Sequence, residues 1–292
     1  PHSGQRTTEH CADRRGSHRG IRVPHRSDSR QWSLLRASLT HVSLLQWVLI
    51  ALAGFGGGAI NAAVGSGTLL VYPVLTGMGV PPVTANGSNG LGLVAGSMTS
   101  AWTYRSLWRD RLQVLRWPIL AGCVGAFLGA LLVIGLDERV FVSVIPWLVL
   151  AATALVGISP LMTRWLRSRK SSSTELPRSM WPYGGIIGVY SGYFGAGQGI
   201  VLLALFGIRY DTHIQRANAA KNAFAAAANL VASAVFLVTG HVDLAVAACI
   251  ALGSIPGGYV GGTWAKRLPD AALRGLVVVV GIVATIYLFK FR

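Results

Sequence analysis

Residues 65–67, Gly-Ser-Gly, and residues 197–199, Gly-Gln-Gly, decide the fold. They lie 132 positions apart, and at that offset the apolar part of the chain aligns with itself without a gap, so that Asn86 meets Asn218. Many transporters consist of two homologous halves, each with an interrupted helix, that build one substrate site near the bilayer midplane. The repeat therefore predicts a membrane protein that moves a small solute.

The composition agrees with a membrane protein. Hydrophobic residues make up 52% of the chain and charged residues 12%, and the mean hydropathy is +0.51. A helix that crosses a bilayer needs roughly 20 apolar residues in a row. From Val42 to Phe289 the chain is a series of such segments with short polar breaks. We therefore predict an all-α integral membrane protein.

Each half has four apolar segments that are long enough to cross. The predicted spans are 42–63, 86–104, 117–135 and 140–162 in the first half, and 182–196, 217–238, 243–264 and 271–289 in the second. A shorter stretch that opens with Gly-x-Gly, 65–80 or 197–210, lies between the first two spans of each half, and its apolar core is too short to cross alone. The prediction is about eight transmembrane helices in two homologous halves, each with a Gly-rich broken or re-entrant segment.

The predicted parts of the chain are a basic disordered extension at 1–41, a first transmembrane repeat at 42–162, a basic cytoplasmic linker at 163–181 and a second repeat at 182–292. If the short stretch is re-entrant, the tail and the basic loops at 105–116 and 163–180 share one side, which the positive-inside rule makes the cytoplasm. Both termini are then cytoplasmic and the repeats are parallel. Lys266 and Arg267 would then lie outside, which is the one disagreement with the rule.

The net charge of +16 does not indicate nucleic-acid binding, because eight of the 26 Lys and Arg lie in the tail and most others lie in loops or at span ends. The expected partners are the lipid bilayer and a small anionic substrate, and the oligomeric state stays open. We find no catalytic constellation, metal spacing or nucleotide-binding loop, so we predict neither an enzyme nor a cofactor.

The glycine breaks are the first candidates for substrate contact. Broken backbone at membrane depth is tolerated where it is buried in protein or lines a watery cavity. A helix that restarts after such a break presents free N–H groups and the positive end of its dipole. Two such starts at one cavity form an anion site without a full charge.

Polar residues at a second break, 81–90 and 213–222, are the other candidates. Lys221 is the most notable, since a Lys costs roughly 2.5–3.5 kcal/mol at the centre of a membrane helix. It either neutralises an anion or extends to the interface, and the Asn residues either bind substrate or only cap helices. The candidate substrate-binding residues are Gly65, Ser66, Gly67, Asn86, Ser88, Asn89, Gly197, Gln198, Gly199, Asn218, Lys221 and Asn222.

The carboxylates bear on the mechanism. No Asp or Glu lies in the middle of a predicted span, although proton-coupled carriers commonly depend on buried carboxylates. An anion that leaves a negative-inside cell gains roughly 2.3 kcal/mol per unit charge and 100 mV. Export by facilitated diffusion is therefore the simplest mechanism that fits.

Residues 49–288 resemble the sulfite exporter TauE/SafE family of membrane permeases. The resemblance is carried by the Gly-rich first helix, the triplet 65–67, Gly79-Val80-Pro81 and the Gly-rich helix 122–129, with the set recurring in the second half. It implies transport of sulfite or an organosulfonate across the plasma membrane. Ser66 and Gln198 stand where the family has small glycines, so the substrate could differ from sulfite. An importer of an organic anion and a non-transporting membrane scaffold or assembly factor are the alternatives.

Overall fold

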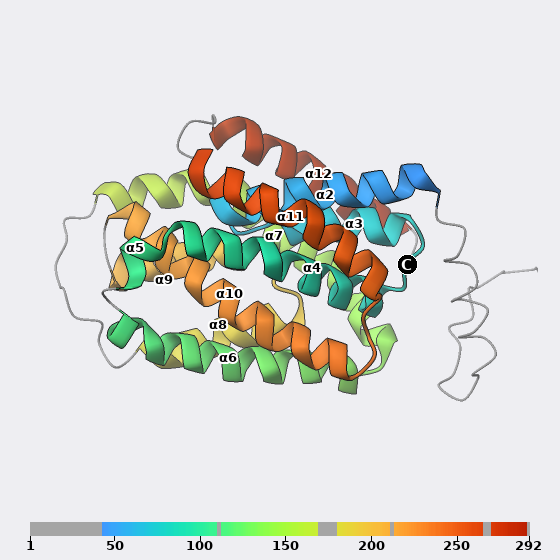
Figure 1. The fold of residues 1–292 in the computed structure, drawn as a ribbon, viewed down its shortest axis with the longest axis horizontal. Coiled ribbons are helices and arrows are strands. Elements are labelled where there is room, and N and C mark those ends of the chain that lie inside the picture. Colours follow the sequence, from blue (N-terminus) through green and yellow to red (C-terminus); the bar gives the residue numbers. More distant parts are fainter. Residues whose placement is uncertain (1–42, 110–111, 169–179, 211–212, 265–269, 291–292) are drawn as a thin grey trace, which may run out of the picture. The chain divides into compact units, whose positions relative to one another are not determined.

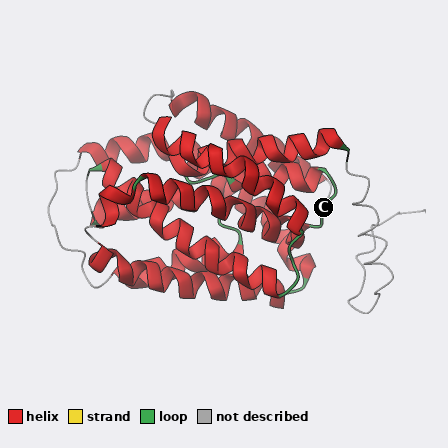
Figure 2. Cartoon of the chain, in the orientation of Figure 1, coloured by secondary structure: helices red, strands yellow, loops and turns green. Residues whose placement is uncertain are grey.

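In a computed structural model of the chain, the described residues are 43–109, 112–168, 180–210, 213–264 and 270–290, and none of them forms a strand (Figure 2). The predicted extension at 1–41 and Lys266 and Arg267 lie outside them. The helices are α2 (Leu44–Ala63), α3 (Thr68–Gly77), α4 (Pro82–Thr103), α5 (Arg105–Trp108), α6 (Leu112–Gly135), α7 (Glu138–Ser168), α8 (Trp181–Tyr193), α9 (Gln198–Arg209), α10 (Ile214–Val238), α11 (Leu244–Trp264) and α12 (Asp270–Lys290). By its contacts the chain divides into Pro1–Ser43 and the helical body Leu44–Arg292.

Five of the described helices are long and apolar enough to cross a membrane, namely α2, α6, α7, α10 and α11. The shorter apolar helices α3 and α9 follow the two glycine triplets. Large apolar side chains cover the outside of the helical body, for example Leu252, which is 73% exposed, and Ile186, which is 69% exposed. Such a surface suits lipid. The predicted spans 86–104, 182–196 and 271–289 correspond to α4, α8 and α12, which are not among the five.

Small residues set the closest helix contacts. A Cβ added at Gly125 on α6 would lie 2.1 Å from the carbonyl oxygen of Gly185 on α8, and one at Gly257 on α11 would lie 2.1 Å from that of Phe55 on α2. The Gly-x-x-x-Gly motifs at 125–129 and 257–261 therefore pack backbone against backbone.

Corresponding pairs of helices lie at the offset of 132 residues. The long contact between α2 and α11 corresponds to the contact between α8 and α6. In the same way, the contact between α4 and α11 corresponds to the contact between α10 and α6. The equivalent helices α4 and α10 face each other antiparallel, because Gly87 contacts Phe236 and Gly90 contacts Ser233. The equivalent helices α7 and α12 are also antiparallel, as the Trp147–Phe289 ring contact helps to show. The arrangement is thus inverted, and the predicted parallel arrangement is wrong.

The direction of α3 explains this correction. Helices α2 and α4 both run parallel to α11, since Gly58 and Gly96 both contact Ser254 while Gly54 and Gly92 both contact Ile250. The short helix α3 therefore carries the chain back between them (Figure 1). Each half consequently runs along the body an odd number of times, in the order α2, α3, α4, α6 and α7 for the first half. We name the end of the body where α2 and α4 begin the α2 end, and the opposite end, where α7 stops and α8 begins, the linker end. Leu44 at the start of α2 and the basic residues that follow α4 (Arg105 and Arg109) therefore lie at opposite ends of the body. The prediction that the first span begins on the side of the basic segment at 105–116 is wrong for these residues, and the tail at 1–41 lies outside the described residues.

Candidate functional site

The two glycine breaks meet in the interior of the helical body. The N–H of Gly199 donates a hydrogen bond to the carbonyl oxygen of Gly65 at 3.1 Å. A Cβ added to either glycine would lie 2.3 Å from the Cα of the other. Gly65 has φ +83° and Gly197 has φ +73°, a left-handed backbone conformation that residues other than glycine rarely adopt. Glycine is therefore required here for both the turn and the close approach.

Beside the breaks lies a small pocket that is partly open to solvent. Its walls come from the end of α2, the start of α3, the first half of α4, the end of α8, the start of α9 and the second half of α10. Its polar lining side chains are Asn61, Thr68, Asn86, Asn89, Ser191, Gln198, Asn229 and Ser233. The stretches of α4 and α10 that line it both lie toward the α2 end.

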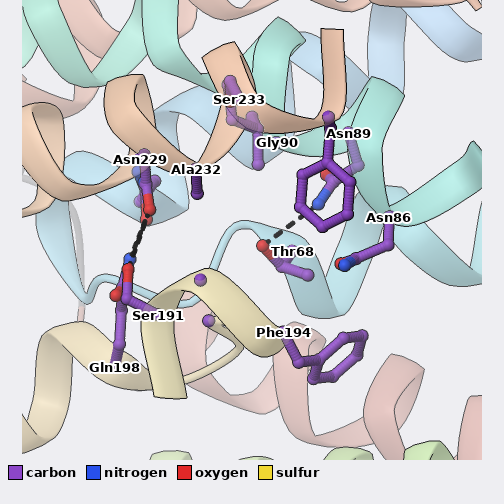
Figure 3. Close-up of a pocket in the computed structure, with 15 residues that line it drawn as sticks. Thr68, Asn86, Asn89, Gly90, Ser191, Phe194, Gln198, Asn229, Ala232 and Ser233 are labelled. Carbon is purple, nitrogen blue, oxygen red and sulfur yellow. Dashed lines mark hydrogen bonds between the residues drawn. The ribbon is translucent and has the colours of Figure 1, made fainter. Parts of the chain in front are cut away.

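Hydrogen bonds orient the pocket's amides (Figure 3). Asn229 Oδ1 accepts from Gln198 Nε2 and from Ser191 Oγ, each at 3.1 Å. Asn89 Nδ2 donates to Thr68 Oγ1 at 3.2 Å. With its oxygen held on that side, the Asn229 Nδ2 group makes no hydrogen bond to another described residue and remains a donor for a ligand.

The starts of two helices contribute to the same pocket. Thr68 is the first residue of α3 and Gln198 the first of α9, and both line it. Neither helix has a side-chain cap at its N-terminus. The positive ends of two helix dipoles thus lie at one cavity. The prediction that these starts present free N–H groups is wrong for Gln198, Gly199 and Ile200, which donate to the carbonyl oxygens of Gly195, Gly65 and Gly197, and for Leu69 and Leu70, which donate to Ser66 and Gly67.

Lys221 does not line this pocket. Its side chain is 0% exposed, and its Nζ donates to the carbonyl oxygen of Ala62 at 3.3 Å. Asn222 Nδ2 donates to the same oxygen at 3.5 Å. The alternative in which Lys221 extends to the membrane surface is therefore wrong, because nothing of the side chain reaches the outside. The reason is that α10 begins at Ile214, which places Lys221 deeper in the helix than predicted.

Comparison with known proteins decides the family. A family model described as "Sulfite exporter TauE/SafE" matches residues 50–288. The chain belongs to the sulfite exporter TauE/SafE family. It is also 27% identical over 236 residues to a "Probable membrane transporter protein" of Haemophilus influenzae, covering 80% of this chain and 90% of that protein. A "Probable membrane transporter protein ORF9" of a Sinorhizobium species is 27% identical over 236 residues, covering 81% and 89%. The chain is a multi-pass membrane protein of a transporter family.

In this TauE/SafE protein the predicted site residues separate into groups. Asn86, Asn89 and Gln198 line the pocket. The residues that form the breaks beside it are Gly65, Ser66, Gly67, Gly197 and Gly199. Asn218, Lys221 and Asn222 lie outside the pocket on the linker-end half of α10. Ser88 serves the fold, because its Oγ accepts a hydrogen bond from the N–H of Asp243 at 2.8 Å.

Several residues of the pocket were not predicted. Asn61, Ser191 and Asn229 each interrupt an apolar helix at depth, which is a signal that sequence inspection could have used, whereas Thr68 and Ser233 are ordinary in such helices. These residues differ in type from those 132 positions away, for example Asn229 from Ser97. A search for polar residues shared by both halves therefore misses them.

Proposed function

We propose that this protein is a plasma-membrane permease that exports a small sulfur-containing anion, sulfite or an organosulfonate, by facilitated diffusion. The observation that carries the proposal is a polar pocket at the point where two glycine breaks meet among membrane helices. Amide and hydroxyl donors and two helix starts line it, with no full charge. Such a site compensates the negative charge of an oxyanion only in part, so the anion can bind and can also leave.

The arrangement of the helices supports two homologous halves of inverted topology that share this site. Equivalent helices are antiparallel, and the broken segments of both halves meet at the pocket. Inverted repeats with discontinuous helices at their interface are a common transporter design. The described acidic side chains Asp137, Glu138 and Asp243 lie at helix ends, which supports a mechanism without a buried proton carrier.

We propose that the linker end is cytoplasmic. The arginines near this end include Arg105, Arg109, Arg116, Arg164, Arg209 and Arg216. The α2 end has Asp137, Glu138, Arg139, Asp243 and Lys290 and is close to neutral. The positive-inside rule then places the start of α2 and the end of α12 outside the cell, in contrast to the cytoplasmic termini predicted from the sequence. A C-terminal alkaline phosphatase fusion should be active and a C-terminal green fluorescent protein fusion dark; the opposite pair would reverse the orientation.

Export is tested in cells that lack a sulfite exporter of their own. Expression of the protein should lower intracellular sulfite and raise sulfite tolerance, and the Gly199→Leu variant at the same membrane abundance should do neither. Higher intracellular sulfite in expressing cells would mean import instead. Unchanged distribution of sulfite and of the organosulfonates tested would favour the scaffold alternative.

A further inference from the structure

Four polar side chains outside the open pocket carry buried N or O atoms that lack hydrogen-bond partners or have fewer than they could make. Among the described residues, Ser66 Oγ, Ser100 Oγ and Asn218 Oδ1 have no hydrogen-bond partner. Ser66 and Ser100 are each 1% exposed. Lys221 has three N–H donors and one hydrogen bond, to Ala62. Buried polar groups are almost always paired, so a cluster of unsatisfied ones indicates a missing ligand.

These groups belong to one region. Ser100 lies in the last turn of α4, and Asn218 and Lys221 lie one turn apart near the start of α10. The two helices pack against each other antiparallel, so these segments lie at the same end of the body. Lys221 contacts Ala62 at the end of α2, and Ser66 follows in the break. The region therefore lies between α4, α10 and the first break.

The region is the counterpart of the open pocket. Ser66, Ser100, Asn218 and Lys221 stand 132 residues from Gln198, Ala232, Asn86 and Asn89, respectively, and those four residues line the pocket. Because α4 and α10 are antiparallel, their pocket-lining segments lie toward the α2 end, and the equivalent segments lie toward the linker end. The inverted arrangement thus places two related sets of polar residues toward opposite ends of the body: the open pocket, and the buried polar cluster of Ser66, Ser100, Asn218 and Lys221 at the linker end.

We propose that the buried polar cluster is a second binding site for a small oxyanion. The Lys221 ammonium pairs with the anion's charge, and the Ser66 and Ser100 hydroxyls donate hydrogen bonds to its oxygens. The site rests on the proposed function and extends it: substrate meets the cation in the cluster at the linker end, then passes the glycine breaks to the amide-lined pocket at the α2 end. One charged and one uncharged site give the path a direction of decreasing affinity.

The test measures thermal unfolding of the purified protein in sodium sulfite and in sodium chloride of equal ionic strength, together with sulfite flux in liposomes. Sulfite should raise the melting temperature of the wild type and of Lys221→Arg clearly more than that of Lys221→Met, which keeps only the amide-lined pocket. Flux through Lys221→Met should fall at least roughly tenfold, while its melting temperature in chloride stays equal or rises, because an apolar side chain replaces a buried charge. If Lys221 has only a structural role, Lys221→Met should instead have a lower melting temperature in chloride and keep the wild-type response to sulfite.

Two further variants keep the test decisive. Lys290→Met makes the same change at an exposed lysine of α12 and should behave as wild type. Ser100→Ala removes an unpartnered hydroxyl, so it should fold normally and weaken sulfite binding roughly 10- to 100-fold. Normal sulfite responses in both Lys221→Met and Ser100→Ala would overturn the second site. A wild type that neither responds to sulfite nor moves it would instead contradict the proposed function itself.

Discussion

Changing Gly199 to Ala should disrupt the point where the two breaks meet. The added Cβ would lie 2.3 Å from the Cα of Gly65 and 2.9 Å from its carbonyl oxygen, whereas carbon atoms pack at about 3.5–4.0 Å. Both contacts are to backbone, so no side chain can rotate away and the loops must separate by about 1 Å or more. This movement also lengthens the 3.1 Å hydrogen bond between the two glycines.

The cost is that of overpacking, roughly 1–3 kcal/mol, plus about 1 kcal/mol for the hydrogen bond. At roughly 2–4 °C per kcal/mol for a chain of this size, the melting temperature should fall by about 4–16 °C. Thermal unfolding in detergent and sulfite flux in liposomes measure the two effects, and flux should be lost even below the melting temperature. The matched control is Gly157→Ala on α7, where a Cβ meets nothing within 4 Å and alanine favours the helix by up to about 1 kcal/mol. Equal stability and flux in the two variants would refute this role for the breaks.

Three other changes have defined outcomes. Asn229→Ala removes the oxygen that holds Gln198 and the free amide donor, so sulfite flux should fall about tenfold in folded protein; full flux would place Asn229 outside the substrate path. Gly253→Leu should lower the melting temperature, because a Cβ there lies 2.1 Å from a carbonyl oxygen of α2, while Gly275→Leu, with nothing within 4 Å, should not; equal melting curves would contradict the packing. Deleting residues 1–41 should leave flux unchanged, and reduced flux would show that the extension takes part.

The local features of this fold could be predicted because each depends on neighbouring residues. The apolar runs specify helices, the Gly-x-Gly triplets specify the short helices α3 and α9, and the paired Gly-x-x-x-Gly motifs specify close packing. In each case the physical cause lies within a few residues of the observation.

The direction of the helices could not be predicted in the same way. Loop charge favours placing all basic segments on one side, and with a basic tail at 1–41 it favours a short stretch that turns back rather than one that crosses. The partners of Asn229 and Lys221 lie 31 and 159 residues away in sequence. Which buried polar residue lines the pocket and which lies in the buried polar cluster therefore depends on tertiary packing.

Potential-driven flux of sulfite through the purified protein tests the central proposal most directly. Liposomes loaded with sulfite should lose it faster when their interior is made negative, and a singly charged anion should distribute roughly 50-fold toward the positive side at 100 mV. Reversing the potential should reverse the flux. Sulfite movement no faster than in protein-free liposomes, or flux that ignores the potential, would contradict an electrogenic sulfite permease.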